Sequence, residues 1–334
     1  MSSGAAGKRT WASITTRAVA CCALLAGTAG RAAEPLAIRD QNPLTRGAYL
    51  PLPALLATDP GELQLAADLQ WTNTVNLEAT RRERMVVDEE SIELDLGLAR
   101  DLGPWRWRAM LPVINRNGGI LDGVIERWHR LFGLPQGDRP GRPRNSYLIT
   151  YQRSGGPAVS APSGTALGDL ALEGGRELIA RPDETLTVWL GVEAPTGLRA
   201  ASTGDGALDA AAWASGALRL APRWSVAGRA GLSRSGGDGL LPFERTLRFA
   251  TATVGFDATA RLECLLQLDL HSAIARGSEL AFLGAVAELT IGGRYRLRSG
   301  ATFEAGVVED VAVNHSPDVT FHLGWRWPTG RSAP

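Results

Sequence analysis

Hydrophobic and polar residues alternate along most of the chain between residues 62 and 327. In one such stretch, Leu262, Cys264 and Leu266 alternate with Glu263 and Gln267. Since successive side chains of a β-strand point to opposite faces, this pattern predicts strands with one apolar and one polar face. Thirteen segments carry it, at residues 62–74, 91–100, 105–113, 146–153, 168–179, 185–194, 207–220, 223–233, 245–258, 261–272, 280–297, 301–310 and 318–327.

The links between these segments differ in length, and short links alternate with long ones. Residues 101–104, 221–222, 258–260 and 298–300 are tight turns, whereas residues 75–90, 114–145, 196–206, 234–244 and 311–317 are longer links. Outer-membrane barrels have short periplasmic turns and longer external loops, whereas a soluble sandwich has no need of this order. Five tryptophans would also lie near one membrane interface as an aromatic girdle, namely Trp105, Trp107, Trp224, Trp325 and Trp327. The sequence therefore predicts an all-β fold, a closed antiparallel transmembrane β-barrel over residues 62–327.

The number of strands is constrained by parity. Single-chain bacterial barrels have an even number of strands, and thirteen segments were found. The link after residues 146–153 is long where the order of links requires a short turn. We therefore place residues 146–153 outside the membrane, which predicts about 12 spanning strands, within a range of about 10 to 14.

Residues 115–141 depart from the alternation. Ile120, Val124, Trp128 and Leu131 recur at the spacing of three and four residues that is typical of one face of a helix. We expect one short amphipathic helix in a long external loop at 115–145, with Asp122 as N-cap and Gly133 as the stop. Its apolar face either packs on the same protein or helps to cover a channel. The loop-helix candidates are Asp122, Glu126, Trp128, His129 and Phe132.

The N-terminus predicts export. Lys8, Arg9 and Arg17 precede an apolar run at residues 18–29, which is too short for a spanning helix and is typical of a signal peptide over residues 1–33. We expect an extended, proline-punctuated periplasmic lead-in at 34–61 and a C-terminal tail at 328–334. Cleavage would leave Cys264 as the single cysteine, so no internal disulfide is expected.

Charge and histidine content narrow the classes of function. The chain carries 35 basic and 35 acidic residues, so it has no basic field that would attract nucleic acid. Its four histidines lack metal-ligand spacing, and we expect no metal and no cofactor. Outer-membrane lipid hydrolases use a histidine and a serine, which draws attention to His271-Ser272 and His315-Ser316. Adjacent residues of a regular strand point apart, so neither pair is expected to form a side-chain hydrogen bond.

Several motifs resemble a known family. They are Asp40-Gln41-Asn42-Pro43, Gly118-Gly119-Ile120-Leu121-Asp122-Gly123, Phe132-Gly133-Leu134-Pro135-Gln136-Gly137, Gly168-Asp169-Leu170 and Pro195-Thr196-Gly197. Together they resemble an uncharacterised family of proteobacterial outer-membrane proteins, known as a domain of unknown function. The resemblance covers nearly the whole mature chain. It implies a barrel in the outer membrane, and it brings no catalytic residues.

The polar faces of the strands predict a charged lumen. The lumen-lining candidates are Arg106, Arg108, Arg229, Glu263, Asp269, His271, Glu288, Arg294, Arg296 and Glu304. Charges of both signs can line a water-filled pore or pair across strands and fill it. We expect a narrow passive channel for small hydrophilic solutes. A sealed structural barrel of the envelope is the alternative and an outer-membrane lipid-modifying enzyme the third possibility. The expected partners are outer-membrane lipid, the barrel-insertion machinery and a small polar solute.

Overall fold

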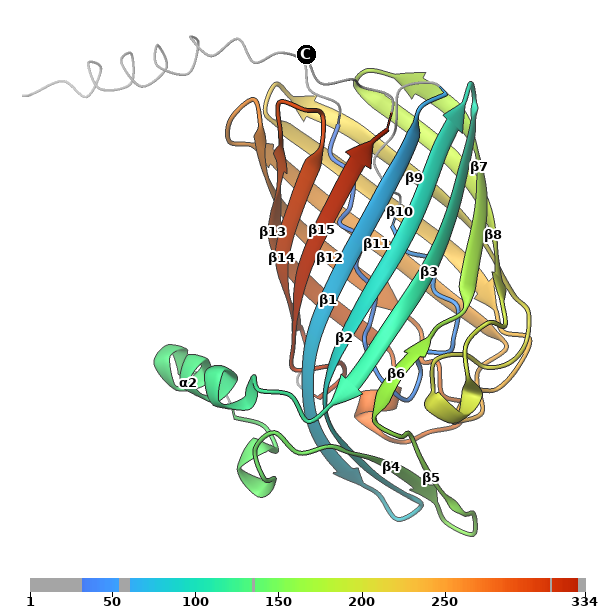
Figure 1. Cartoon of the computed structure of the whole chain (residues 1–334), viewed down its shortest axis with the longest axis vertical. Coiled ribbons are helices and arrows are strands. Elements are labelled where there is room, and N and C mark those ends of the chain that lie inside the picture. The colour runs from blue at the N-terminus through green and yellow to red at the C-terminus, as the bar shows by residue number, and fades with distance from the viewer. Residues whose placement is uncertain (1–31, 54–60, 134–135, 313, 330–334) are drawn as a thin grey trace, which may run out of the picture.

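A computed structural model describes residues 32–53, 61–133, 136–312 and 314–329, and its main body is a barrel (Figure 1). The predicted signal segment therefore lies outside the described residues except for Ala32 and Ala33. The wall strands are β1 (Leu63–Ala79), β2 (Glu83–Leu102), β3 (Trp105–Asn117), β7 (Leu170–Arg181), β8 (Glu184–Ala194), β9 (Asp209–Ala221), β10 (Trp224–Arg234), β11 (Thr246–Asp257), β12 (Leu262–His271), β13 (Val286–Arg296), β14 (Thr302–Asp310) and β15 (Val319–Pro328).

The ring closes where the first strand pairs with the last. Strand β1 pairs with β15 from Gln64↔Pro328 to Asn73↔Val319, and all other neighbours in the wall are antiparallel. The described sheet has fifteen strands, of which the short β4 (Leu148–Arg153), β5 (Ala158–Ser160) and β6 (Gly164–Leu167) are not separate members of the ring, which leaves twelve. The predicted closed antiparallel barrel of about 12 strands is confirmed.

The two faces of the wall follow the sequence alternation. On β12, Leu262, Cys264 and Leu266 are exposed on the outside, whereas Glu263 and Gln267 are buried on the inside. Large apolar side chains gather on the outer surface of the other strands in the same way, among them Leu65, Leu96, Leu190, Ile291 and Leu323. An apolar outer band with a polar interior is the pattern of a barrel that contacts lipid. In the described ranges, no helix has the length and hydropathy to cross a membrane.

Two predicted boundaries differ from the structure at the long-loop end. Residues 75–90, expected as a link, instead extend β1 and β2 into a hairpin that projects beyond the barrel (Figure 1). Its β2 arm, Glu83–Asp88, pairs with β4, so residues 148–153 lie outside the ring as expected. Residues 280–285 precede β13, because Leu280 and Leu283 pack into an apolar cluster under the loops.

Helical elements occur in the long links. They are α2 (Asp122–Phe132) and the 3-10 turns η1 (Arg139–Gly141), η2 (Arg199–Ala201) and η3 (Ala281–Leu283). Gly133 ends α2 in the left-handed conformation with φ 69°, as predicted. The N-cap prediction is wrong, because Leu121 occupies that position and Asp122 is the first helical residue. The Asp122 carboxylate instead accepts hydrogen bonds from Asn73, Arg139 and the backbone of Asn145.

The N-terminal lead-in differs most from expectation. We expected an extended periplasmic segment at 34–61, but residues 32–53 lie inside the barrel, and we call them the luminal segment. Leu36, Leu44 and Tyr49 are almost fully buried there. Burial is possible because the wall supplies polar partners for the backbone of this irregular stretch.

Candidate functional site

The luminal segment enters at the short-turn end of the barrel. The Ala33 amide donates to Ser225 Oγ at 3.0 Å, close to the turn before β10. Further along, the Leu36 amide donates to Gln267 Oε1 at 2.7 Å, halfway along β12. Leu36 and Ile38 pack against Leu265 and Val308 on the inner wall. Both polar and apolar contacts therefore hold the entering arm.

The segment reverses direction near the long loops, at the Asp40-Gln41-Asn42-Pro43 motif. Asp40 Oδ1 accepts the Asn42 amide and Asn42 Oδ1 accepts the Leu44 amide, both at 3.0 Å, which is the geometry of successive Asx turns. Asn42 Nδ2 donates to the Phe282 carbonyl oxygen of η3 at 2.7 Å. The Pro43 carbonyl accepts from Ser202, beside η2. This motif forms the tip of the luminal segment and binds it to two long loops.

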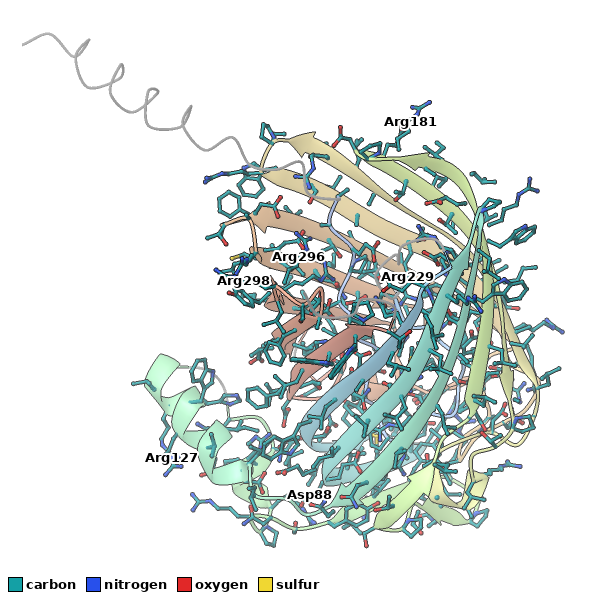
Figure 2. The ribbon with its side chains drawn as sticks, turned by 45° about the horizontal axis from the view of Figure 1, so that its top comes forward. Asp88, Arg127, Arg181, Arg229, Arg296 and Arg298 are labelled. Atoms are coloured by element: carbon teal, nitrogen blue, oxygen red, sulfur yellow. The ribbon has the colours of Figure 1, made fainter. Side chains whose placement is uncertain are left out.

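The returning arm runs back towards the middle of the barrel. The Tyr49 amide donates to Asp209 Oδ2 at 3.3 Å, and its hydroxyl donates to Glu173 Oε1 at 3.2 Å. Arg229 of β10, which lies within the ring in Figure 2, donates to the Pro51 carbonyl oxygen. The luminal segment is thus a hairpin-like insertion held on both arms.

Charged pairs fix the segment to β2. Arg39 Nη2 lies 2.5 Å from Glu93 Oε1 and 3.0 Å from Asp95 Oδ1, and Arg46 Nε lies 3.6 Å from Glu93 Oε2. Both carboxylates are fully buried. The two arginines neutralise wall charges that water would otherwise have to solvate.

An aromatic cluster lines the inner face of β8, β9 and β11. Trp189 and Trp213 stack with ring centroids 5.8 Å apart, and Trp213 meets Phe249 edge-on. Tyr49 and Leu50 of the luminal segment belong to the same buried cluster. The guanidinium of Arg108 lies 3.9 Å from the Trp189 ring centroid, within cation–π range. We had predicted a charged lumen, and the aromatic part was missed because Trp189 and Trp213 lie at inward positions between outward leucines and alanines.

A chain of ion pairs crosses the closing seam of the barrel. Arg326 Nη2 lies 2.7 Å from Asp68 Oδ1 and 3.1 Å from Glu304 Oε2. Glu304 Oε1 in turn lies 2.6 Å from Arg294 Nε, and Arg294 Nη1 lies 3.0 Å from Glu263 Oε2. These residues come from β1, β15, β14, β13 and β12. The network therefore ties the first strand to the last four on the inner face.

One group in the described residues has the composition of a metal site. Ligand atoms of Asp68, Glu304 and His322 lie within 4.8 Å of one another. Arg326 already forms ion pairs with both carboxylates, so a divalent cation would be placed against a guanidinium. The arrangement fits an ion-pair network better than a metal centre.

The predicted lumen-lining residues lie on the inner face. Arg108, Arg229, Glu263, Glu288, Arg294 and Glu304 are buried there, while Arg106, Asp269, His271 and Arg296 are partly buried. Many pair with each other, and Arg294, Arg229 and His271 contact the luminal segment. His271 Nδ1 lies 2.8 Å from the backbone oxygen of Ser272, and its Nε2 lies 3.3 Å from Asp40. The structure thus pairs His271 with an acid of the luminal segment and with no serine hydroxyl.

The loop-helix candidates lie outside the bore. Glu90 accepts the amides of Ile120 and Leu121, and Leu121 and Ile125 pack on Trp71, Val319 and Phe321. Gly119 is required because its φ is +65° and a Cβ there would lie 2.0 Å from the Glu90 side chain. Trp128 is exposed, Glu126 pairs with Arg144, and His129 is buried. For Phe132 only the backbone is described. Figure 1 shows α2 beside the barrel, so it does not cover the mouth.

Two further motifs of the resemblance meet in the long loops. Asp169 Oδ1 accepts the Gly197 amide at 2.7 Å, and Thr196 Oγ1 donates to the Gly168 carbonyl oxygen at 2.8 Å. Burial raises the pKa of Asp169, and the nearby Asp205 carboxylate raises it further. Contacts between Gly168-Asp169-Leu170 and Pro195-Thr196-Gly197 therefore join two loops at the long-loop end of the barrel.

Comparison with solved structures places this fold among known barrels. The structure is similar to the COG4313 outer membrane channel from Pseudomonas putida F1, with TM-score 0.54 and 12% identity over 81% of this chain and 97% of that chain. The NanC porin aligns with TM-score 0.44 and 8% identity over 79% of this chain and 98% of that one. A comparison with curated protein sequences found no match. A family model described as a protein of unknown function matches residues 13–328.

Proposed function

We propose that this chain, which belongs to the DUF3187 family of proteins of unknown function, is an outer-membrane channel for small hydrophilic solutes. In this proposal the luminal segment is the gate of the channel. The observation that carries the proposal is a barrel with an apolar outer band and a charged interior, whose bore is occupied by a segment held through hydrogen bonds and ion pairs. Such contacts can break and re-form without a change in the wall.

The occupied state leaves little room for a solute. The cavity between the luminal segment and strands β2, β3 and β7, lined by Arg39, Tyr49, Asp95 and Glu173, has a volume of about 10 Å³. That is space for about one water molecule. In this proposal, a solute passes this part of the bore only when the luminal segment is displaced. The acids and arginines released by this movement would then line a polar bore and favour hydrophilic solutes.

The same filling favours the sealed structural barrel as a second candidate. Arg294, Glu304 and His322 are almost fully buried, as expected of an interior that stays closed. In both cases the short turns would face the periplasm and the long loops the cell exterior, after export and insertion by the barrel-insertion machinery.

Planar-bilayer recordings distinguish the two candidates. The full chain should conduct rarely or in brief openings, whereas a variant in which residues 34–53 are replaced by a short Gly-Ser linker should conduct continuously. Replacement of residues 120–133 serves as the matched control, because α2 lies beside the wall, and it should leave conductance unchanged. A heat-dependent shift on gels would verify that each variant forms a closed barrel. Folded variants that never conduct would favour the sealed barrel.

A further inference from the structure

The helix α2 carries an apolar surface that the barrel does not cover. Leu121 and Ile125, at its start and on its inner side, pack against the wall. Ile120 and Leu131, in contrast, are 70% and 76% exposed, and Val124 and Trp128 are 47% and 52% exposed. We call these four residues the free stripe of the helix. The four side chains lie close together, on a helix of eleven residues and the residues just before it. They form one apolar patch, whereas single exposed apolar residues scattered over a surface would need no explanation.

The place of the helix limits what can cover this stripe. Residues Trp71, Val319 and Phe321, on which α2 packs, belong to the outward faces of β1 and β15. In Figure 1 the helix extends sideways from the wall at the long-loop end. The helix is therefore attached to the outward faces that also carry the apolar outer band, which includes Leu323 on the same strand β15.

The charges around the stripe are mainly positive. Arg127 and Arg130 on the helix and Arg144 in the following loop are exposed. Glu126 is the neighbouring carboxylate, and it already pairs with Arg144 at 2.5 Å and with Arg130 at 3.5 Å. Figure 2 shows Arg127 on the side of α2 away from the barrel. An apolar stripe flanked by arginines is the composition of a helix that lies in a membrane interface.

We propose that α2 lies in the interface of the external leaflet, with its free stripe among the acyl chains and its arginines on anionic lipid phosphates. Trp128 has an apolar body and a polar N–H group, which suits the headgroup level. The guanidinium groups match phosphate geometry and can extend to it on long side chains. The inference depends on the barrel lying in a membrane and not on its conducting.

Hydrogen bonds and ion pairs at the start of α2 support this placement of the helix. Arg139 Nη1 lies 2.9 Å from Asp122 Oδ1, and Arg139 Nη2 lies 2.6 Å from Asp318 Oδ2 and 2.5 Å from Asn73 Oδ1. Asn73 Nδ2 donates to Asp122 Oδ1 at 3.0 Å. These bonds hold the start of α2 against the outer wall. The free stripe is thus presented at a fixed height relative to the outer band.

Site-specific fluorescence quenching in vesicles tests the proposal. Leu131→Cys and Arg127→Cys, each combined with Cys264→Ser, would carry an environment-sensitive label, and Cys264 of the unchanged chain would carry it in the outer band. The vesicles would contain phosphatidylcholine and phosphatidylglycerol, with a nitroxide-bearing phospholipid as lipid quencher and iodide as aqueous quencher. We expect lipid quenching at residues 131 and 264 and several-fold weaker iodide quenching there than at residue 127.

The outcomes separate the possible occupants. Equal iodide quenching at residues 131 and 127, with lipid quenching at residue 264, would place the free stripe in water and overturn the proposal. Protection of residue 131 from both quenchers, with disulfide formation between copies of the Leu131→Cys variant, would show that a second copy covers it and would also overturn it. Absence of lipid quenching at residue 264 would overturn this proposal and the membrane placement together.

The arginines have a test of their own. In the Leu131→Cys background, the label should show a larger blue shift with phosphatidylglycerol present than in phosphatidylcholine alone. The triple substitution of Arg127, Arg130 and Arg144 to Gln should remove this difference while lipid quenching at residue 131 remains. A difference that survives the triple substitution would overturn the assignment of the arginines to lipid phosphates.

Discussion

Arg39 of the luminal segment bridges two acids of one wall strand, since its Nη2 lies 2.5 Å from Glu93 Oε1 and 3.0 Å from Asp95 Oδ1. Glu93 and Asp95 are two residues apart on β2 and therefore share the inner face. Without Arg39, two buried carboxylates would lie side by side with Arg46 as the remaining nearby cation. This relationship makes Arg39 a principal electrostatic attachment of the luminal segment.

The substitution Arg39→Gln should therefore loosen the segment. Breaking a buried ion pair costs about 3 to 5 kcal/mol, and the barrel should unfold at lower urea concentration. Conductance in bilayers should rise at the same time, because the gate is held less firmly. Arg298→Gln, on an exposed turn, is the control and should change neither. Unchanged conductance with the expected loss of stability would argue against the gate.

The charge network at the seam gives a second prediction. Glu304→Gln removes the carboxylate shared by Arg294 and Arg326, so the free energy of unfolding should fall by about 3 to 5 kcal/mol. In the barrel that lacks residues 34–53, the same substitution should shift ion selectivity towards anions, because one interior negative charge is lost. Reversal potentials in a salt gradient measure this. Asp183→Asn, on the turn between β7 and β8, should leave selectivity unchanged.

The outer band gives a third prediction. Leu266 is exposed on the outside of β12, between wall strands that share its apolar face. Leu266→Arg should lower the free energy of unfolding in lipid by about 2 to 4 kcal/mol if residue 266 lies near the membrane midplane. Ser299→Arg, on the turn after β13, is the matched control and should have little effect. Equal stability of both variants would contradict lipid contact at residue 266.

The ion pairs that hold the loop of α2 against the wall give a fourth prediction. Arg139→Gln removes the cation that joins Asp122 to Asp318, so the start of α2 should detach more often from the wall. A loss of about 1.4 kcal/mol in local stability corresponds to about tenfold faster cleavage when proteolysis depends on local opening. Trypsin digestion of folded protein in detergent, followed at Arg127 and Arg130, measures this rate. A rate equal to that of the unchanged protein would show that these bonds do not hold the loop.

The barrel wall could be predicted from the sequence, whereas the luminal segment inside it could not. Strict alternation around Leu262, Cys264 and Leu266 determines which side chains face lipid, and the pairing of Arg294 with Glu304 follows from the tight turn between β13 and β14. The luminal segment has no such periodicity, and Pro-rich extended chain has the same pattern in water and inside a barrel. The signal that could have found it is the excess of inward charges that need partners, such as Glu93 and Asp95 beside Arg39.

The contacts of the long loops could not be predicted from the sequence either. Asp122 has the sequence position of an N-cap, but tertiary contacts with Arg139 and Asn73 determine its role. The hairpin at residues 75–90 was expected as a link, and its acids Glu89 and Glu90 interrupt the apolar alternation. Their neighbours come from distant parts of the chain, since Glu90 accepts the amides of Ile120 and Leu121 and Arg116 Nε lies 3.8 Å from Glu89 Oε2. The local sequence pattern does not predict these long-range partners.

The course of the luminal segment determines how it can leave the barrel. It begins beside Ser225 near the short-turn end, reaches η3 at Asn42, and the chain is again at the short-turn end where the Gly61 amide donates to Asp101. It therefore enters and returns through one opening and is not threaded through the ring. Withdrawal needs no break in the β1–β15 seam, so the bore could empty and refill many times in one intact, membrane-embedded molecule.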